Sequence, residues 1–366
     1  YFGLSEKDLS TVFESATELG GDKKSLNKIL DQLRQTYCGP IGVEFMYCRD
    51  EKLRQWLYKT MEPCANHPSF SKDEQLDILE KIEHAVLFEN FLQNKYIGKK
   101  RFSLEGLEVI IPGLDQLLRT AATKYDVKEM VLGMAHRGRL NILANIFQKS
   151  YADVFSEFEE NILVEYFRTG GDVKYHLGRS ADITTKENKS MHLHLIANPS
   201  HLEAVNPVLQ GMVYEKAQQR YASNSAPILP ILIHGDAAIS GQGINYEVAN
   251  FSQLEGYEVG GTIHIVLNNQ VGFTANYKES RSSVYCTDLA KVTESPVFHV
   301  NADNPESVVH AIKMALDIRQ KFKKDVYVDI LGYRKYGHNE GDEPRFTQPI
   351  LYKKIAKHKN IYHLYL

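Results

Sequence analysis

The sequence predicts an α/β protein with a doubly wound, mainly parallel sheet, preceded by a smaller helical region. Three observations support this class. Short apolar runs rich in β-branched residues recur after residue 100, and helical stretches follow most of them. The residues before that point carry helix-start signals instead. With 366 residues, of which 43% are hydrophobic, the chain can bury a large core.

Residues 1–100 are predicted to form a helical N-terminal region. Ser5, Ser25 and Ser71 stand where helix N-caps belong. Ser71 and Glu74 also form a capping box ahead of an amphipathic apolar run. We therefore expect this region to serve packing rather than catalysis.

Residues 101–366 are predicted to form one α/β domain of alternating strands and helices. The predicted strands are short and mostly apolar, and they occupy residues 130–133, 191–195, 231–234, 262–267, 297–300 and 326–331. The predicted helices occupy residues 140–147, 202–221 and 305–321. Pro305 suits the first turn of the last of these helices.

Composition excludes several classes of function. The net charge is −3 and both signs are interspersed, so we expect neither a nucleic-acid surface nor a polybasic membrane anchor. The four cysteines show no Cys-x-x-Cys spacing and are too few for a disulfide scaffold, which favours a reducing compartment. No apolar run approaches the ~20 residues of a spanning helix, and no signal-peptide pattern opens the chain.

Asp236 and Asn269 each follow a predicted strand in a strand–helix–strand unit over residues 231–273. Parallel strands joined by a helix end at the same edge of a sheet, where open α/β sheets bind ligands. A carboxylate, a side-chain amide oxygen and the backbone carbonyl of Val271 are oxygen ligands suited to Mg²⁺, and they leave positions for water and phosphate. The unit therefore predicts a diphosphate held through its metal ion.

Three further turns are expected at the same edge. The turn at residues 134–139 brings Arg137 and Arg139 to a helix N-terminus, which favours an anion. The turn at residues 198–202 places Ser200 at another helix start, where its hydroxyl can donate to phosphate or carboxylate. A glycine-containing loop at residues 336–340 is positioned to reach over the bound ligand.

Ordinary structural roles compete with these interpretations. Gly-Asp and Asn-Asn pairs commonly end strands, and a histidine in a loop is usually solvated or hydrogen-bonded locally. His192 and His194 alternate on one strand, but no second pair with zinc-ligand spacing accompanies them. A nicotinamide-binding loop is disfavoured, because Tyr246 stands where the motif that starts at Gly241 needs its third glycine.

Five longer motifs carry a resemblance to a known family. They are GMAHRGRLN at residues 133–141, GDVKYHLG at 171–178, NPSHLEAV at 198–205, HGDAAISGQG at 234–243 and YGHNEGDEPRFTQP at 336–349. Together with the Asn-Asn pair at residues 268 and 269, they resemble the thiamine-dependent, decarboxylating dehydrogenase components of 2-oxoglutarate dehydrogenase complexes. The resemblance runs from about residue 101 nearly to the C-terminus and implies a thiamine diphosphate-binding fold.

The resemblance implies cofactor and metal contacts for individual residues. Asp236, Asn269 and the carbonyl of Val271 would coordinate the Mg²⁺ of thiamine diphosphate. Valine stands at position 271 where many relatives have isoleucine, a change without consequence if only its carbonyl is a ligand. The residues expected to contact the cofactor are Arg137, Ser200, Leu202, Asp236, Ala237, Ala238, Asn269 and Val271.

Catalytic and substrate-binding residues are implied in the same way. His136, His176 and His338 match the active-site histidines of the family. His176 and Ser200 would bind the 2-oxo acid. Imidazoles suit this chemistry because they can donate hydrogen bonds to a carboxylate or move a proton near neutral pH.

The activity implied by the resemblance is decarboxylation of 2-oxoglutarate and transfer of the succinyl group to a lipoyl-bearing succinyltransferase, a step of the tricarboxylic acid cycle. Relatives are homodimers, located in the bacterial cytoplasm or the mitochondrial matrix. Two alternatives remain open. A related enzyme acting on 2-oxoadipate differs by one methylene, which a pocket discriminates by only ~1–3 kcal/mol. A non-catalytic fragment that binds the cofactor is the other.

In this family, the glutamate that activates thiamine lies on a second, pyrimidine-binding domain further along the chain. The sequence ends at IYHLYL without such a domain. We therefore expect a fragment that is inactive on its own.

Overall fold

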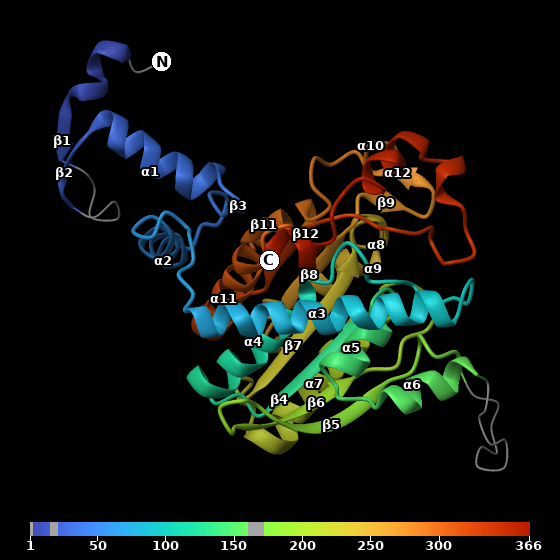
Figure 1. The fold of residues 1–366 in the computed structure, drawn as a ribbon. Coiled ribbons are helices and arrows are strands. Elements are labelled where there is room, and N and C mark those ends of the chain that lie inside the picture. The colour runs from blue at the N-terminus through green and yellow to red at the C-terminus, as the bar shows by residue number, and fades with distance from the viewer. Residues whose placement is uncertain (1–2, 15–20, 160–171) are drawn as a thin grey trace.

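The computed structural model describes residues 3–14, 21–159 and 172–366, and a sheet of eight strands lies at the centre of this part (Figure 1). The order across the sheet is β3-β11-β12-β8-β7-β4-β6-β5. The strands are β3 (Ile41–Glu44), β4 (Glu129–Met134), β5 (Arg179–Thr184), β6 (Ser190–Leu195), β7 (Ile228–Gly235), β8 (Ile263–Asn268), β11 (Val297–Asn301) and β12 (Val326–Leu331). All six predicted strands are confirmed.

The interior of the sheet is parallel. The neighbouring strands from β11 to β6 run in one direction, whereas β3 and β5 pair antiparallel at the two edges. Strands β4 and β8 are buried along their whole length, as expected for parallel strands that are covered on both faces. The predicted doubly wound, mainly parallel sheet is confirmed.

Helices cover both faces of the sheet (Figure 1). On one face lie α3 (Lys72–Lys95), α4 (Ile110–Lys124), α5 (Arg139–Asn145) and α11 (Pro305–Phe322), which share a core with Met130 and Leu132 of β4. On the other face lies α7 (Val205–Tyr221), which packs against Val131 of the same strand. This alternation along β4 follows from the period of two in a strand.

The N-terminal region contains helices and short strands. It comprises η1 (Glu6–Ser10), β1 (Val12–Glu14), β2 (Lys23–Ser25), α1 (Leu26–Cys38), β3 and α2 (Glu51–Met61). The capping box of Ser71 and Glu74 at the start of α3 is confirmed. The predicted helical N-terminal region is confirmed; in addition, its strand β3 pairs with β11, and α2 joins the main core. The domain boundary at residue 100 stays a prediction.

The remaining elements lie in the chain between strands of the sheet or after its last strand, β12. They are α6 (Tyr151–Phe158), α8 (Asp236–Gly241), α9 (Ile244–Phe251), β9 (Val271–Gly272), β10 (Ala275–Asn276), α10 (Tyr277–Ser280), η4 (Asp288–Thr293), η5 (Pro344–Phe346), α12 (Pro349–Ile355) and α13 (Ile361–Tyr365). The motif glycine at position 171 lies outside the described residues.

The order of the strands reverses between β4 and β7. The chain leaves β4 for β6 on one side, then crosses back through α7 to β7 on the other side and continues to β8. Such a switch point leaves a crevice outside the carboxyl ends of its two strands, and ligands of open α/β sheets bind there. The turns after β4 and β7 are therefore the first place to look for a site.

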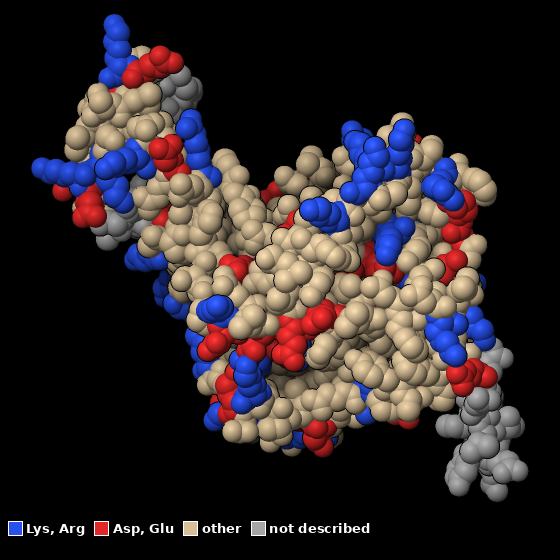
Figure 2. Space-filling view, in the orientation of Figure 1, with Lys and Arg blue, Asp and Glu red and all other residues tan. Residues whose placement is uncertain are grey.

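The face in Figure 2 carries Lys and Arg side chains interspersed with Asp and Glu. In the ranges that the structure describes, no helix is both long and apolar enough to cross a membrane.

Glu108 is a buried acid that gives the fold a pH dependence. Glu108 is 3% exposed, and its carboxylate accepts a 2.8 Å hydrogen bond from the amide of Gly106. Burial, together with the charges of Glu105 and Glu89, raises the pKa of Glu108 from 4.5 to about 7. The folded protein therefore retains a proton at pH values at which the unfolded chain has released it.

We expect Glu108→Gln to stabilise the protein by an amount that grows as the pH rises above 4.5. The cost of ionising Glu108 is absent below pH 4.5, grows as the pH rises and is complete above pH 7. A rise of this size corresponds to about 3 kcal/mol. Denaturant unfolding should give equal free energies for wild type and variant near pH 4.5, and a gain of that order for the variant at pH 8. The exposed control Glu255→Gln should show no gain, and an equal gain for Glu108→Gln at both pH values would contradict the account.

Candidate active site at the carboxyl edge of the sheet

A cavity lies beside the switch point, where β4, β7 and β8 end. Its walls come from the turns after these strands and from the loop at residues 336–340. Most of the predicted site residues line it, namely His136, Arg137, Leu202, Asp236, Ala237, Ala238, Asn269, Val271 and His338. The remaining two, His176 and Ser200, are not among its lining residues.

Asp236 and Asn269 lie side by side at the floor of this cavity. The parallel pairing of β7 with β8 sets Gly235 opposite Leu267, so the two chains leave the sheet together. The backbone amide of Asn269 hydrogen-bonds to the Asp236 carboxylate. The side-chain oxygen of Asn269 accepts a 3.1 Å hydrogen bond from the amide of Val271, which draws the third predicted ligand into the same turn.

The Asp236 carboxylate is buried and only partly satisfied. Asp236 is 2% exposed, and its Oδ2 has no hydrogen-bond partner. Burial raises the pKa of Asp236 to about 6, although the positive charge of Arg281 opposes the rise. Arg281 Nη1 lies 3.6 Å from that Oδ2, and Arg281 Nε and Nη1 have no hydrogen-bond partner either. A buried anionic oxygen thus faces a buried cation across a gap without a hydrogen bond.

Arg137 ties the turn after β4 to two other segments. Its Nη1 donates to the carbonyl of Ser103 at 3.0 Å, and its Nη2 donates to the carbonyl of His338 at 2.6 Å. Burial is the main reason why the pKa of Arg137 falls to about 10. The guanidinium therefore remains charged at neutral pH and adds a fixed positive charge to the cavity wall.

His136 and His338 both line the cavity and contact each other edge to face, with ring centroids 5.8 Å apart. Burial, and then the charge of Arg137, lowers the pKa of His136 to about 3 and that of His338 to about 4. Both rings are therefore neutral at physiological pH. A neutral imidazole still donates one hydrogen bond and accepts another.

His176 and Ser200 form a pair next to the cavity. Ser200 Oγ lies 3.3 Å from His176 Nε2, and a carboxylate oxygen of Asp172 lies 3.1 Å from His176 Nδ1. The ring of Tyr175 connects this pair to the cavity, because it contacts both His176 and Phe102. The structure thus brings the two residues together, and Tyr175 and Phe102 link them to His136.

Four residues that line the cavity or contact its lining residues were not predicted from the sequence. Phe102 contacts His136 from a loop before α4. Arg281 comes from the turn after α10, and Arg334 and Phe273 line the wall near His338. Arginine is a common residue for anion binding, but nothing in the local sequence separates Arg281 or Arg334 from other arginines. Only the folded chain places them at the site.

His192 and His194, weighed as zinc ligands, have other contacts. His192 Nδ1 lies 2.7 Å from Asp182, and His194 Nδ1 lies 2.7 Å from the hydroxyl of Ser180. In the described part of the chain, no three His, Cys, Asp or Glu residues form a group that could hold a metal ion. A site made of Asp236, Asn269 and a backbone carbonyl is not such a group, because only one of its three ligands is one of these four residue types.

Comparisons with known proteins agree on one family. A sequence profile described as "Dehydrogenase E1 component" matches residues 80–365. The chain is 47% identical over 367 residues to the 2-oxoglutarate dehydrogenase E1 component of Cupriavidus necator, with 100% of this chain and 38% of that protein covered. It is 48% identical over 379 residues to the mitochondrial 2-oxoglutarate dehydrogenase of Dictyostelium discoideum, with 100% and 37% covered.

A third relative has a broader description. The chain is 46% identical over 363 residues to the multifunctional 2-oxoglutarate metabolism enzyme of Mycolicibacterium vanbaalenii, with 98% of this chain and 29% of that protein covered. The chain therefore spans between 29% and 38% of the length of these curated relatives.

Proposed function

The chain belongs to the dehydrogenase E1 component family, and from that premise we propose that it is the part of a 2-oxoglutarate dehydrogenase E1 component that binds the diphosphate and metal ion of thiamine diphosphate. The full-length protein would decarboxylate 2-oxoglutarate and pass the succinyl group to a lipoyl-bearing succinyltransferase. One observation carries the proposal. The Asp236 carboxylate lies beside Asn269 at the switch point, with an oxygen that has no hydrogen-bond partner.

The residues present fit the cofactor. The side-chain oxygens of Asp236 and Asn269, with the carbonyl of Val271, are hard ligands of the kind that Mg²⁺ prefers. Gly272 leaves room at this point, because a Cβ there would lie 2.5 Å from the Cβ of Ala237. Arg137, Leu202 and Ala238 line the same cavity and would contact the cofactor. Ser200, from the neighbouring pair, would add a further contact.

Bound thiamine diphosphate would supply a carbanion that attacks the 2-oxo carbon and a ring that accepts the electrons released with carbon dioxide. The protein must bind the substrate, exclude water and stabilise the oxygen on which negative charge develops. Neutral His136 and His338 can each donate a hydrogen bond into the cavity. The pair of His176 and Ser200 offers donors for a substrate carboxylate.

We propose the substrate and partners on the same basis. Names of two relatives specify 2-oxoglutarate dehydrogenase, which favours 2-oxoglutarate over 2-oxoadipate. A homodimer, a lipoyl-bearing partner and a bacterial cytoplasmic or mitochondrial matrix location are further proposals that depend on this assignment. Steady-state kinetics of the full-length protein with both 2-oxo acids test the substrate. A kcat/KM for 2-oxoadipate equal to or above that for 2-oxoglutarate would contradict the choice.

Arg281 provides a test of the metal site that needs no catalysis. Its guanidinium stands 3.6 Å from the Asp236 oxygen that a metal ion would contact. We expect Arg281→Met to tighten the binding of Mn²⁺ alone by about tenfold, because a competing positive charge near a carboxylate weakens the site for a second cation. Electron paramagnetic resonance can measure free Mn²⁺ during the titration.

The control for Arg281→Met is Lys278→Met, which removes a charge from the same segment without touching Asp236. Its Mn²⁺ affinity should equal that of wild type. Weaker Mn²⁺ binding by Arg281→Met would show that Arg281 and the metal ion do not compete for Asp236.

A further inference from the structure

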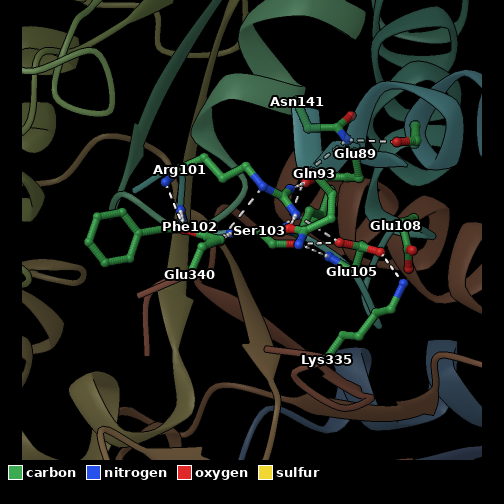
Figure 3. A network of polar contacts seen from close by, with 12 residues as sticks. Glu89, Gln93, Arg101, Phe102, Ser103, Glu105, Glu108, Asn141, Lys335 and Glu340 are labelled. Carbon is green, nitrogen blue, oxygen red and sulfur yellow. Dashed lines mark hydrogen bonds and ion pairs between the residues drawn. The ribbon is translucent and has the colours of Figure 1, made fainter. Parts of the chain in front are cut away.

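The segment from Arg101 to Ser103 lies between the candidate site and a buried charge network, which Figure 3 shows from close by. The guanidinium of Arg101 forms ion pairs with Glu89 and Glu105, and its side chain is 1% exposed. Lys335 forms a further ion pair with Glu105. These ion pairs hold the Arg101 side chain, and with it the start of the segment, in place.

Glu340 binds the backbone of this segment. Its carboxylate accepts hydrogen bonds from the amides of Arg101 at 2.8 Å, Phe102 at 3.1 Å and Ser103 at 2.8 Å (Figure 3). The Glu340 side chain is 3% exposed. Three successive amides that converge on one anion form a backbone nest, and here the anion is supplied by the protein itself.

Phe102 has the backbone conformation that this nest requires. Its φ is +49°, in the left-handed region that bulky residues rarely adopt. Such a conformation persists only where the surroundings over-determine it, and residues of this kind concentrate at functional sites. The Glu340 carboxylate stabilises this conformation of Phe102, because it accepts hydrogen bonds from all three amides.

The ring of Phe102 points away from Glu340, towards the candidate site. It is 7% exposed, and its centroid lies 4.0 Å from that of His136 and 5.6 Å from that of His338. The ring of Tyr175 contacts it at 4.8 Å and leads to His176. One phenyl ring therefore contacts two of the predicted catalytic histidines directly and the third through one neighbour.

The loop that supplies Glu340 also supplies His338. Arg137 strengthens the connection, because it donates to the carbonyls of both Ser103 and His338. The amide of Gly138 donates to the carbonyl of Phe102 at 2.9 Å. In this structure, the loop at residues 336–340 fills the nest, and Phe102 stands against both imidazoles.

We propose that Phe102 is a positioning residue that holds the imidazoles of His136 and His338 in one arrangement, and that Glu340 holds Phe102 in the required conformation through the nest. The catalytic meaning of this arrangement rests on the function proposed above. Seating of the loop and assembly of the histidine pair are then one event. Loss of Glu340 and loss of the Phe102 ring should have the same consequence.

Kinetics of the full-length protein test this proposal. Glu340→Gln places an amide in the nest and Phe102→Leu removes the ring, and each should lower kcat by about 10- to 100-fold, the effect of misplaced catalytic groups. KM and the Kd for thiamine diphosphate should change by less than about threefold, because the metal and diphosphate ligands lie in other turns. The double variant should be no slower than the slower single variant, because both changes break one unit.

Matched variants separate positioning from general damage. Glu343→Gln removes a partly exposed carboxylate from the same stretch of chain, and its kcat should equal that of wild type. Phe102→Tyr keeps the ring, and it should retain kcat within about threefold of wild type. Single variants with kcat within twofold of wild type, or effects that multiply in the double variant, would overturn the proposal.

A spectroscopic readout keeps the inference distinct from the proposed function. With histidines labelled, the ring protons of His136 should be shifted upfield by the Phe102 ring in wild type. Glu340→Gln and Phe102→Leu should both abolish this shift, while Phe102→Tyr and Glu343→Gln should retain it. A shift that survives in Glu340→Gln would refute the role of the nest. Wild-type protein that decarboxylates no 2-oxo acid yet shows these shifts would refute the proposed function alone.

Discussion

Replacement of Asp236 by asparagine is expected to weaken the Mg²⁺-dependent binding of thiamine diphosphate by at least about 100-fold. Removal of an outer-shell group around a metal ion typically costs 10- to 100-fold in affinity, so loss of a charged ligand should cost no less. Asparagine keeps the size of the side chain and one oxygen, and therefore isolates the effect of charge. Isothermal titration calorimetry with cofactor and Mg²⁺ measures the change.

The stability of this variant provides its control. In the metal-free protein, Asp236 is a buried carboxylate with an oxygen that has no hydrogen-bond partner, and such a group does not stabilise the fold. Asp236→Asn should therefore melt at the wild-type temperature or above it. Asp126→Asn, an exposed change in the turn before β4, should leave both the melting temperature and the cofactor affinity unchanged. Undiminished cofactor binding by Asp236→Asn would remove Asp236 from the metal site.

Replacement of His136 by leucine is expected to lower kcat of the full-length protein by about 10²–10³-fold, the usual effect of removing one donor that stabilises a developing negative charge. Burial and the charge of Arg137 hold the pKa of His136 at about 3, so the ring acts as a neutral donor across the physiological range. The Kd for thiamine diphosphate should change by less than about threefold. Stopped assays of decarboxylation, combined with calorimetry, separate the two quantities.

A conservative variant shows whether donation is the property that matters. His136→Gln retains an N–H donor of similar reach, and it should recover part of the lost kcat. If leucine and glutamine lower kcat equally, His136 acts through its shape or basicity instead. If leucine lowers kcat by less than about threefold, His136 has no part in the reaction.

The central sheet could be predicted because its signals are local. Strands β4 and β8 are short, mainly apolar runs, and each lies fully buried in the parallel part of the sheet. The edge strands were missed. In β5, most residues are exposed or half-buried and polar, and β3 has four residues, so neither shows the apolar pattern of an interior strand.

The neighbouring positions of Asp236 and Asn269 could also be predicted, because topology links them to sequence. A right-handed crossover between parallel strands places Asp236 and Asn269 at one edge wherever the helix lies. Phe102 and Arg281 escaped prediction for the opposite reason. Each contacts a residue of the cavity from a loop whose path depends on the packing of the whole chain. The nest that holds Phe102 depends on Glu340, which is 238 residues further along.

The central claim is that Asp236 and Asn269 converge on one Mg²⁺ that holds the diphosphate of thiamine diphosphate. A crystal structure of the full-length protein soaked with cofactor and Mg²⁺ tests it most directly. We expect one metal ion beside the diphosphate, with a side-chain oxygen of Asp236 and of Asn269 at about 2.0–2.1 Å from it. Cofactor density with a metal ion that neither side chain contacts would contradict the claim.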